Sequence, residues 1–232
     1  MQIRALAGEF IGTAFLLAGV VGSGIMGERL SPDAGVVLLA NSAATAGVLL
    51  IIIHMFGPVS GAHFNPVVTL AEAALGDRRW PEVIPYIVTQ AAGGVFGTIL
   101  ANLMFDLDAV NVSTKVRTGS HLWLAEVVAT YGLVLVIFLL VRSGRTKLVA
   151  AAVASYIGAA YWFTASTSFA NPAVTVARTL SDTFAGIEPA SAPMFVVMQL
   201  VGAALAVVTA RLLYPPVARR VASRTADKGG VP

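Results

Sequence analysis

Two short apolar segments that begin with Asn-Pro constrain the fold of this chain more than any other feature. Residues 65–75 begin with Asn65-Pro66, and residues 171–180 begin with Asn171-Pro172. Asn is a favoured helix N-cap and Pro a favoured first helical residue, so each segment is predicted to be helical. At about 1.5 Å per residue, about ten residues reach only halfway across a hydrocarbon core of about 30 Å. Both segments are therefore predicted to enter a membrane without crossing it.

The membrane setting follows from composition. Of the 232 residues, 57% are hydrophobic and only 12% are charged, and the mean hydropathy is +0.82. A soluble domain of this size needs more charge to cover its surface. An all-α membrane protein is predicted, with spans long enough to cross a bilayer at residues 3–26, 35–56, 82–105, 122–141, 148–166 and 193–214.

The two halves of the chain, residues 1–110 and 111–217, repeat the same residue types in the same order. The matching pairs are Glu9 and Glu126, Thr13 and Thr130, Asn65 and Asn171, Gln90 and Gln199, and Gly93 and Gly202. Each half contains three spans, an odd number, so the second half starts on the opposite side of the membrane. The repeat is therefore inverted, and the two half-helices are expected to meet near mid-membrane. Residues 218–232 are predicted to form a basic tail.

The basic residues predict an orientation. If both termini lie in the cytoplasm, eleven of the fifteen basic residues lie on the cytoplasmic side, and the other four are Arg29, Lys115, Arg117 and Arg178. This excess agrees with the positive-inside tendency of membrane proteins. We expect a multi-pass protein of the plasma or inner membrane with both termini in the cytoplasm.

Two re-entrant loops imply a cavity. Non-helical backbone at membrane depth is tolerated only where protein buries it or where it lines a water-filled space. The start of each half-helix carries roughly half a positive elementary charge from its dipole. Two such ends facing each other repel cations, while the Asn amides donate hydrogen bonds to a passing oxygen. The predicted site suits small neutral polar molecules.

The doubled Asn-Pro-Ala-type motif resembles that of the aquaporin, or major intrinsic protein, family. The run 60–64 (Ser-Gly-Ala-His-Phe) before the first motif, and Glu9 and Glu126 in equivalent spans, strengthen the likeness. The resemblance implies six tilted helices plus two half-helices, a passive pore in each subunit and a homotetramer. Val67 replaces the Ala that is usual in the first motif. The pore-centre residues that the resemblance implies are Asn65, Pro66, Val67, Asn171, Pro172 and Ala173.

The resemblance also places an outer selectivity filter by spacing from the two Asn residues. Its four positions fall on Thr45, Ala159, Ser168 and Val174. Water-selective members are expected to have an aromatic residue, His and Arg at the first, second and last of these. The small residues found here predict a wide, permissive filter without a fixed cation.

Two alternatives at this filter remain open. Phe169 takes the third position in place of Ser168 if the loop is one residue shorter, and an aromatic ring there would narrow the pore and favour an amphipathic solute such as glycerol. Arg178 follows Val174 by four residues and so lies on the same helix face about 5.4 Å further out. It is either a displaced vestibule charge or, as we favour, an Arg that snorkels to the headgroup level.

The remaining polar residues in the apolar segments and loops are expected to have mainly structural roles. Glu9 and Glu126 are expected to brace the re-entrant loops by accepting backbone hydrogen bonds, as the resemblance implies, in preference to relaying protons. His63 either lines the cytoplasmic pore mouth or orients its loop. His54 and His121 share no ligand spacing with it, and the chain contains no Cys, so we expect no metal site.

These features predict a passive channel resembling the aquaglyceroporin side of the family, for glycerol-sized neutral solutes and water. The filter also resembles that of bacterial members associated with arsenic resistance, which implies neutral metalloid hydroxides such as arsenous acid as further solutes. The alternatives are a water-selective aquaporin, an ion-coupled secondary transporter and, least favoured, a membrane enzyme. We expect no cofactor and no nucleic-acid partner; the expected partners are small neutral solutes, water, membrane lipid and further copies of the chain.

Overall fold

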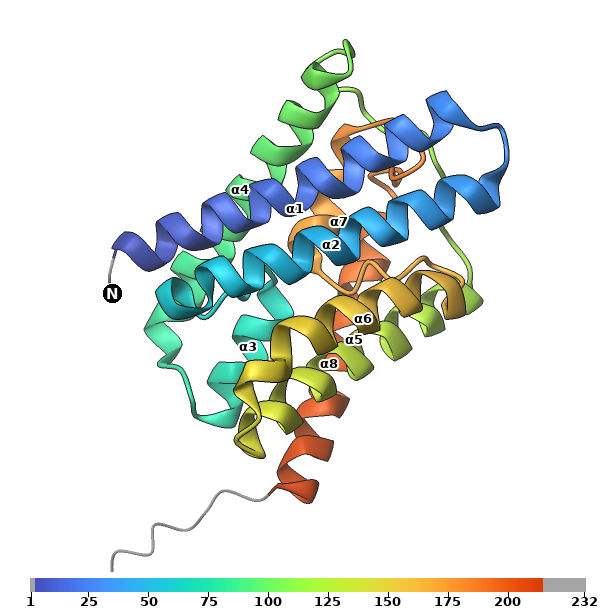
Figure 1. The fold of residues 1–232 in the computed structure, drawn as a ribbon. Coiled ribbons are helices and arrows are strands. Elements are labelled where there is room, and N and C mark those ends of the chain that lie inside the picture. Colours follow the sequence, from blue (N-terminus) through green and yellow to red (C-terminus); the bar gives the residue numbers. More distant parts are fainter. Residues whose placement is uncertain (1–2, 215–232) are drawn as a thin grey trace, which may run out of the picture.

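The computed structural model describes residues 3–214, so the predicted tail at residues 218–232 lies outside the described part. All regular elements of the described part are helices. These are α1 (Ile3–Leu30), α2 (Ala34–Ser60), α3 (Pro66–Leu75), η1 (Trp80–Glu82), α4 (Val83–Met104), α5 (Ser120–Arg142), η2 (Thr146–Leu148), α6 (Val149–Phe163), α7 (Pro172–Ala177), η3 (Arg178–Leu180) and α8 (Ala192–Leu213). Figure 1 shows this order along the chain.

The predicted spans correspond to α1, α2, α4, α5, α6 and α8. Five of these, counting η1 with α4, are long and apolar enough to cross a membrane, whereas α6 has only 15 residues and is preceded by the short turn η2. The second span is longer than predicted and ends at Ser60. The helix continues through Pro58 and ends where Gly61, at φ 91°, adopts the left-handed conformation typical of a helix C-terminus.

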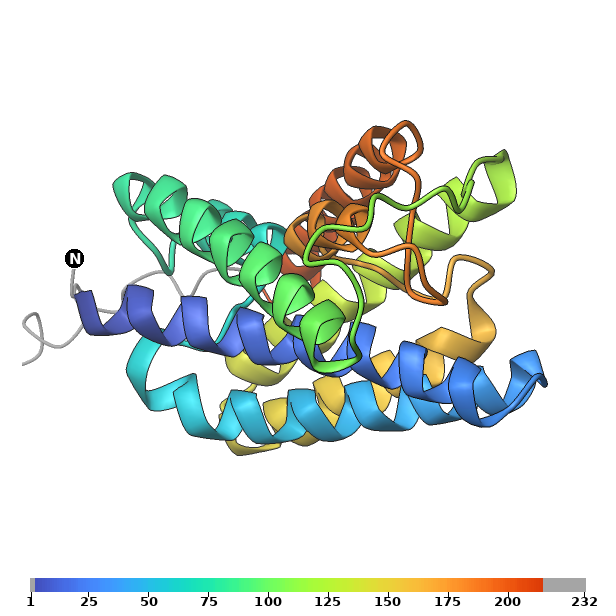
Figure 2. The same ribbon diagram turned by 90° about the horizontal axis from the view of Figure 1, so that it is seen from above.

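The two halves pack in the same way. Helix α1 lies against α2 and α4, and α5 lies against α6 and α8 in the equivalent arrangement. Helices α2 and α6 join the halves, and each half-helix contacts the last long helix of the other half as well as its own. Figures 1 and 2 show α1 and α2 running side by side in both views. The predicted all-α fold class is confirmed, with two half-helices among the longer helices and with α6 shorter than the other five.

Glycines allow the closest helix approaches. A Cβ atom added to Gly93 of α4 would lie 2.4 Å from the carbonyl oxygen of Phe10, and one on Gly97 would lie 2.2 Å from that of Ala14. In the second half, a Cβ atom on Gly202 would lie 2.5 Å from the carbonyl oxygen of Val127. The backbones of each first and last helix therefore cross too closely for any side chain at these positions.

The half-helices begin at the two predicted Asn-Pro pairs. Asn65 caps α3, with its side-chain Oδ1 accepting from the backbone N–H of Val67 at 3.0 Å. Asn171 caps α7 in the same way, accepting from Ala173 at 3.0 Å. In both helices Pro is the first residue, where its missing N–H is not needed.

Candidate functional site

The two capping asparagines hold the half-helices together at the centre of the molecule. Nδ2 of Asn65 donates to the carbonyl oxygen of Ala170 at 2.8 Å, and Nδ2 of Asn171 donates to that of Phe64 at 2.8 Å. Each amide nitrogen bears a second hydrogen, and both Asn residues line one cavity. The reciprocal bonds therefore fix both amides and leave one donor on each.

The loops before the half-helices share an uncommon backbone. Ala62 and Phe64 have φ values of 53° and 51°, and the equivalent Ser168 and Ala170 have 52° and 48°. Residues other than glycine seldom adopt this left-handed conformation, because it costs about 1–3 kcal/mol for each residue. Other contacts must therefore stabilise the loops. The inverted repeat thus extends to individual torsion angles.

Glu9 is fully buried behind the first loop and supplies such contacts. Its carboxylate accepts from the backbone N–H groups of His63 at 3.0 Å and Phe64 at 2.7 Å. It also accepts from Ser60 Oγ at 2.7 Å and Gln90 Nε2 at 2.7 Å. Hydrogen bonds to a charged acceptor are stronger than neutral ones.

Glu126 occupies the same place in the second half. It accepts from the backbone N–H groups of Phe169 at 3.0 Å and Ala170 at 2.9 Å, and from Gln199 Nε2 at 2.6 Å. Gln199 Nε2 also donates to Thr175 Oγ1 at 2.9 Å, as Gln90 does to Thr69 at 3.0 Å. Neither glutamate is among the cavity-lining residues, which agrees with loop bracing better than with a proton path along the cavity.

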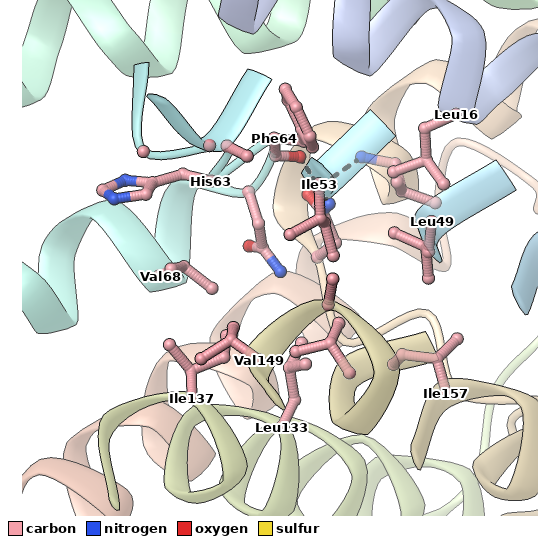
Figure 3. A pocket seen from close by; sticks show the side chains of 18 of the residues that line it. Leu16, Leu49, Ile53, His63, Phe64, Val68, Leu133, Ile137, Val149 and Ile157 are labelled. Carbon is pink, nitrogen blue, oxygen red and sulfur yellow. Dashed lines mark hydrogen bonds between the residues drawn. The ribbon is translucent and has the colours of Figure 1, made fainter. Parts of the chain in front are cut away.

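A cavity of about 550 Å³ runs past both asparagines and is lined from both halves. Its wall is mostly apolar. In Figure 3, His63 and Val68 lie across the open space from Leu133, Ile137 and Val149. Of the residues after each Asn-Pro pair, Val68 and the equivalent Val174 line the cavity. Val67, by contrast, is buried in an apolar cluster with α5 and α8 residues, and Ala173 is buried without being among the lining residues.

We call the part of the cavity lined by Thr45, Tyr161, Ser168, Phe169, Val174 and Arg178 the α7 end. Thr45 Oγ1 and the Tyr161 hydroxyl are 3.1 Å apart, so they share a hydrogen bond. Ser168 Oγ is buried and has no hydrogen-bond partner in the described part of the chain. Both Ser168 and Phe169 line the cavity, so the predicted alternatives are present together.

The expectation for Ala159 is wrong. Ala159 is exposed on the outer side of α6 and is not among the residues that line the cavity, whereas Val153, Ile157 and Tyr161 are buried and line it. The lining residues follow one helix face at intervals of four, and Ala159 lies about 200° around the helix from Tyr161. Counting back from Asn171 fails because it assumes a fixed length for the connection between α6 and α7.

The snorkelling interpretation of Arg178 is also wrong. Arg178 is only 1% exposed and lines the cavity. Its Cζ atom lies 3.4 Å from the centroid of the Phe169 ring, and its Nε donates to the carbonyl oxygen of Ala185. Together with Tyr161 these groups put two aromatic rings and a cation at the α7 end. An end lined only by small residues without a fixed cation is therefore not what the structure contains.

The opposite part of the cavity, the α3 end, is lined by His54, His63, Glu72, Asp77 and Lys147, among others. The Thr69 hydroxyl lies 3.2 Å from the Asn65 carbonyl oxygen and 2.9 Å from His63 Nδ1, so it links the His63 ring to the start of α3. His63 Nε2 lies 3.2 Å from Glu72 Oε2, which also pairs with Arg78. His63 thus both lines the cavity and is fixed to its loop.

Sequence reasoning missed Tyr161, Val68 and Glu72, although the repeat contained a signal for the last two. Val68 and Val174 stand three residues after their Asn, and Glu72 and Arg178 stand seven after it. His63 and Phe169 stand two before it, so His63 with Glu72 and Phe169 with Arg178 are equivalent pairs. Within residues 3–214, no group of three or more His, Asp or Glu side chains has a geometry suited to a metal ion.

Comparison with known proteins gives consistent results. The family model "Major intrinsic protein" matches residues 1–168 and again 142–231. The chain is 47% identical to Aquaglyceroporin AqpS of Rhizobium meliloti (strain 1021) over 226 residues, which cover 96% of the chain and 97% of that protein. It is 31% identical to the Glycerol uptake facilitator protein of Streptococcus pneumoniae (strain ATCC BAA-255 / R6) over 60% of the chain and 65% of that protein.

A solved structure shares the fold. The X-ray structure of the aquaglyceroporin from Plasmodium falciparum superposes with a TM-score of 0.72, covering 93% of this chain and 97% of the other, at 18% sequence identity.

Proposed function

The chain belongs to the major intrinsic protein family, and from this premise we propose that it is a passive transmembrane channel for small uncharged solutes such as glycerol, and for water. The observation that carries the proposal is a cavity lined by both Asn65 and Asn171, whose amides are fixed by reciprocal bonds. Both half-helix N-termini face this point, so their dipoles disfavour cations while the free amide hydrogens bind oxygen atoms. A neutral solute with hydroxyl groups meets both conditions.

The α7 end supplies the selectivity filter in this proposal. The rings of Tyr161 and Phe169 offer apolar contact to the carbon skeleton of a polyol. Arg178 and the Ser168 hydroxyl, which has no hydrogen-bond partner among residues 3–214, offer hydrogen bonds to its oxygens. An amphipathic filter of this kind favours glycerol over a solute that is polar on all sides. Arsenous acid is a second candidate solute for a different reason: it is small and uncharged, and its three hydroxyl groups can accept the same hydrogen bonds.

Three further assignments follow from the same premise. Glu9 and Glu126 brace the two loops, because their acceptor bonds stabilise the left-handed backbone that precedes each half-helix. The protein lies in the plasma or inner membrane with both termini in the cytoplasm, as the distribution of basic residues favours. It assembles as a homotetramer, as the family resemblance implies, and native mass spectrometry in detergent would measure the number of subunits.

The test is a stopped-flow assay on proteoliposomes, with empty liposomes as the control. We expect fast, non-saturating flux of water, glycerol and arsenous acid, independent of ion gradients. Flux of water alone would support the water-selective alternative and contradict the proposed filter. Saturable flux that depends on a proton or sodium gradient would indicate a secondary transporter instead.

A further inference from the structure

Arg117 lies outside the cavity yet touches the groups that form its α7 end. It belongs to the connection between α4 and α5, which runs alongside residues 178–191. Ser113 N donates to the Thr179 carbonyl oxygen at 2.9 Å, and Glu188 N donates to that of Lys115 at 2.8 Å. The backbone N–H of Arg117 donates to Ser191 Oγ at 3.1 Å. The connection between the halves is thus docked on the segment that follows α7.

Two arginines bind consecutive carbonyl groups of that segment. Arg117 donates through Nε to the Gly186 oxygen at 2.8 Å and through Nη2 to the Phe184 oxygen at 3.1 Å. Arg178 donates through Nε to the Ala185 oxygen between them. The position of the Arg178 side chain therefore depends on a backbone that Arg117 holds on both sides.

The same two arginines also share one aromatic ring. The Phe169 ring lies 3.4 Å from Arg178 Cζ and 5.1 Å from Arg117 Cζ, measured to its centroid. It packs edge-on against Phe195 at 5.1 Å. Phe169 is thus held from outside the cavity by Arg117 and faces Arg178, which lines the cavity.

The Arg117 guanidinium is buried at a cost in desolvation free energy. Arg117 is 9% exposed, and no described carboxylate lies within ion-pairing distance of it. Burial lowers the pKa of its guanidinium to about 10. A buried charge held only by carbonyl groups and an aromatic face is seldom retained for stability alone, because its desolvation opposes folding.

We propose that Arg117 is a positioning residue for solute selectivity: it holds Phe169 and residues 184–186 so that Arg178 keeps the α7 end narrow. The inference rests on the proposed channel function. When Arg117 is removed, the Arg178 side chain and the Phe169 ring lose their outer support, and the opening widens. The flux of larger polyols then increases more than the flux of glycerol does.

The measured quantity is the ratio of erythritol flux to glycerol flux in proteoliposomes. Arg117→Met is expected to raise this ratio by about threefold or more, a typical size for coupling between contacting groups. Arg117→Lys keeps the charge but loses the planar fork that binds two carbonyl groups, so a smaller rise is expected. If Arg117→Met does not fold, the Lys variant carries the test.

Arg29, in the last turn of α1, is the matched control because it also binds a carbonyl oxygen and an aromatic ring. It donates to the Phe105 carbonyl oxygen and lies 5.2 Å from the Phe105 ring, but neither residue lines the cavity. Arg29→Met should leave the flux ratio unchanged. A general loss of stability would lower both fluxes together and leave the ratio as it is.

A double variant tests whether Arg117 acts through Arg178. Combining Arg117→Met with Arg178→Met should give the flux ratio of Arg178→Met alone, because the group being positioned is already absent. Independent, multiplicative effects would overturn the inference, as would unchanged ratios in both Arg117 variants. Absence of glycerol flux in the unaltered protein would instead overturn the proposed function.

Discussion

Val174 is the lining residue whose replacement tests the proposed filter most directly. It lies one helical turn inward from Arg178 on the same face and is 5% exposed. Val174→Arg would put a second guanidinium beside the first, narrowing the α7 end and adding unpaired charge. We expect glycerol flux to fall about tenfold or more, which corresponds to about 1.4 kcal/mol, and water flux to fall less.

Val174→Leu is the control for this substitution, since it adds bulk without charge and should reduce glycerol flux only slightly. Stopped-flow measurements with both solutes distinguish the variants. Equal losses of water and glycerol flux in Val174→Arg would place the restriction elsewhere along the cavity.

The two buried glutamates permit a second prediction at this scale. Replacing Glu9 or Glu126 by Gln puts an amide group where the carboxylate accepts backbone and side-chain hydrogens. Loss of charged hydrogen bonds at a fully buried site costs about 1.5–3 kcal/mol for each bond that is not remade. Glu9→Gln and Glu126→Gln should both unfold at lower temperature than the unaltered protein and reduce the flux of every solute alike.

Thermal unfolding in detergent and multi-solute flux assays check this expectation, with the exposed Asp108→Asn as the control. A proton relay would behave differently. Variants that unfold at the normal temperature but lose a proton-dependent flux would contradict the bracing role.

Among the elements, the half-helices were the most predictable from sequence, because local chemistry determines where they begin. An Asn cap followed by Pro defines a helix start whatever surrounds it, and the structure has α3 and α7 beginning at Pro66 and Pro172. The lining face of α6 was not predictable in this way. It depends on how the helix is rotated within the bundle, which tertiary packing decides, so Tyr161 was missed and Ala159 was misplaced.

Arg178 shows why burial was harder to predict than position. The sequence correctly put it one turn beyond Val174, but its surroundings come from Phe169, Ala185 and the connection carrying Arg117. These contacts join segments that are distant in the chain. Pairing the halves residue by residue shows that Arg178 and Phe169 are equivalent to Glu72 and His63, but the contact within each pair is visible only in the structure.

The crossing of α1 and α4 gives a prediction about elements. Gly93→Ala would bring a Cβ atom to 2.4 Å from the backbone oxygen of Phe10, which no side-chain movement can relieve. The two helices must separate, and we expect a clear fall in the temperature of unfolding together with reduced flux.

Gly47 in α2 is the matched control, because an added Cβ would meet nothing within 4 Å. Gly47→Ala should be neutral or stabilising by up to about 1 kcal/mol, since Gly disfavours helix interiors. Similar unfolding temperatures for the two variants would contradict the close crossing as a packing requirement.

The orientation of the whole molecule in the membrane can be tested through its lysines, which occur only at positions 115, 147 and 228. Lys115 precedes α5 and Lys147 follows it, so one span separates them and they lie on opposite sides of the membrane. The proposed orientation has Lys115 outside. Intact cells treated with a membrane-impermeant amine-acylating reagent should therefore acquire label at Lys115, and at Lys147 only after lysis.

The pKa of Lys115 sharpens this experiment. Desolvation of its ammonium group, aided by repulsion from Arg117, lowers the pKa to about 8 from the ordinary 10.5. Near pH 8 about half of the side chains are neutral and reactive, and labelling should fall steeply below that pH as the group gains its proton. Lys147, labelled in lysates at the same pH, provides a comparison. Lys115→Arg should abolish labelling of this protein in intact cells. Label at Lys147 but not at Lys115 in intact cells would reverse the orientation and place the α7 end on the cytoplasmic side.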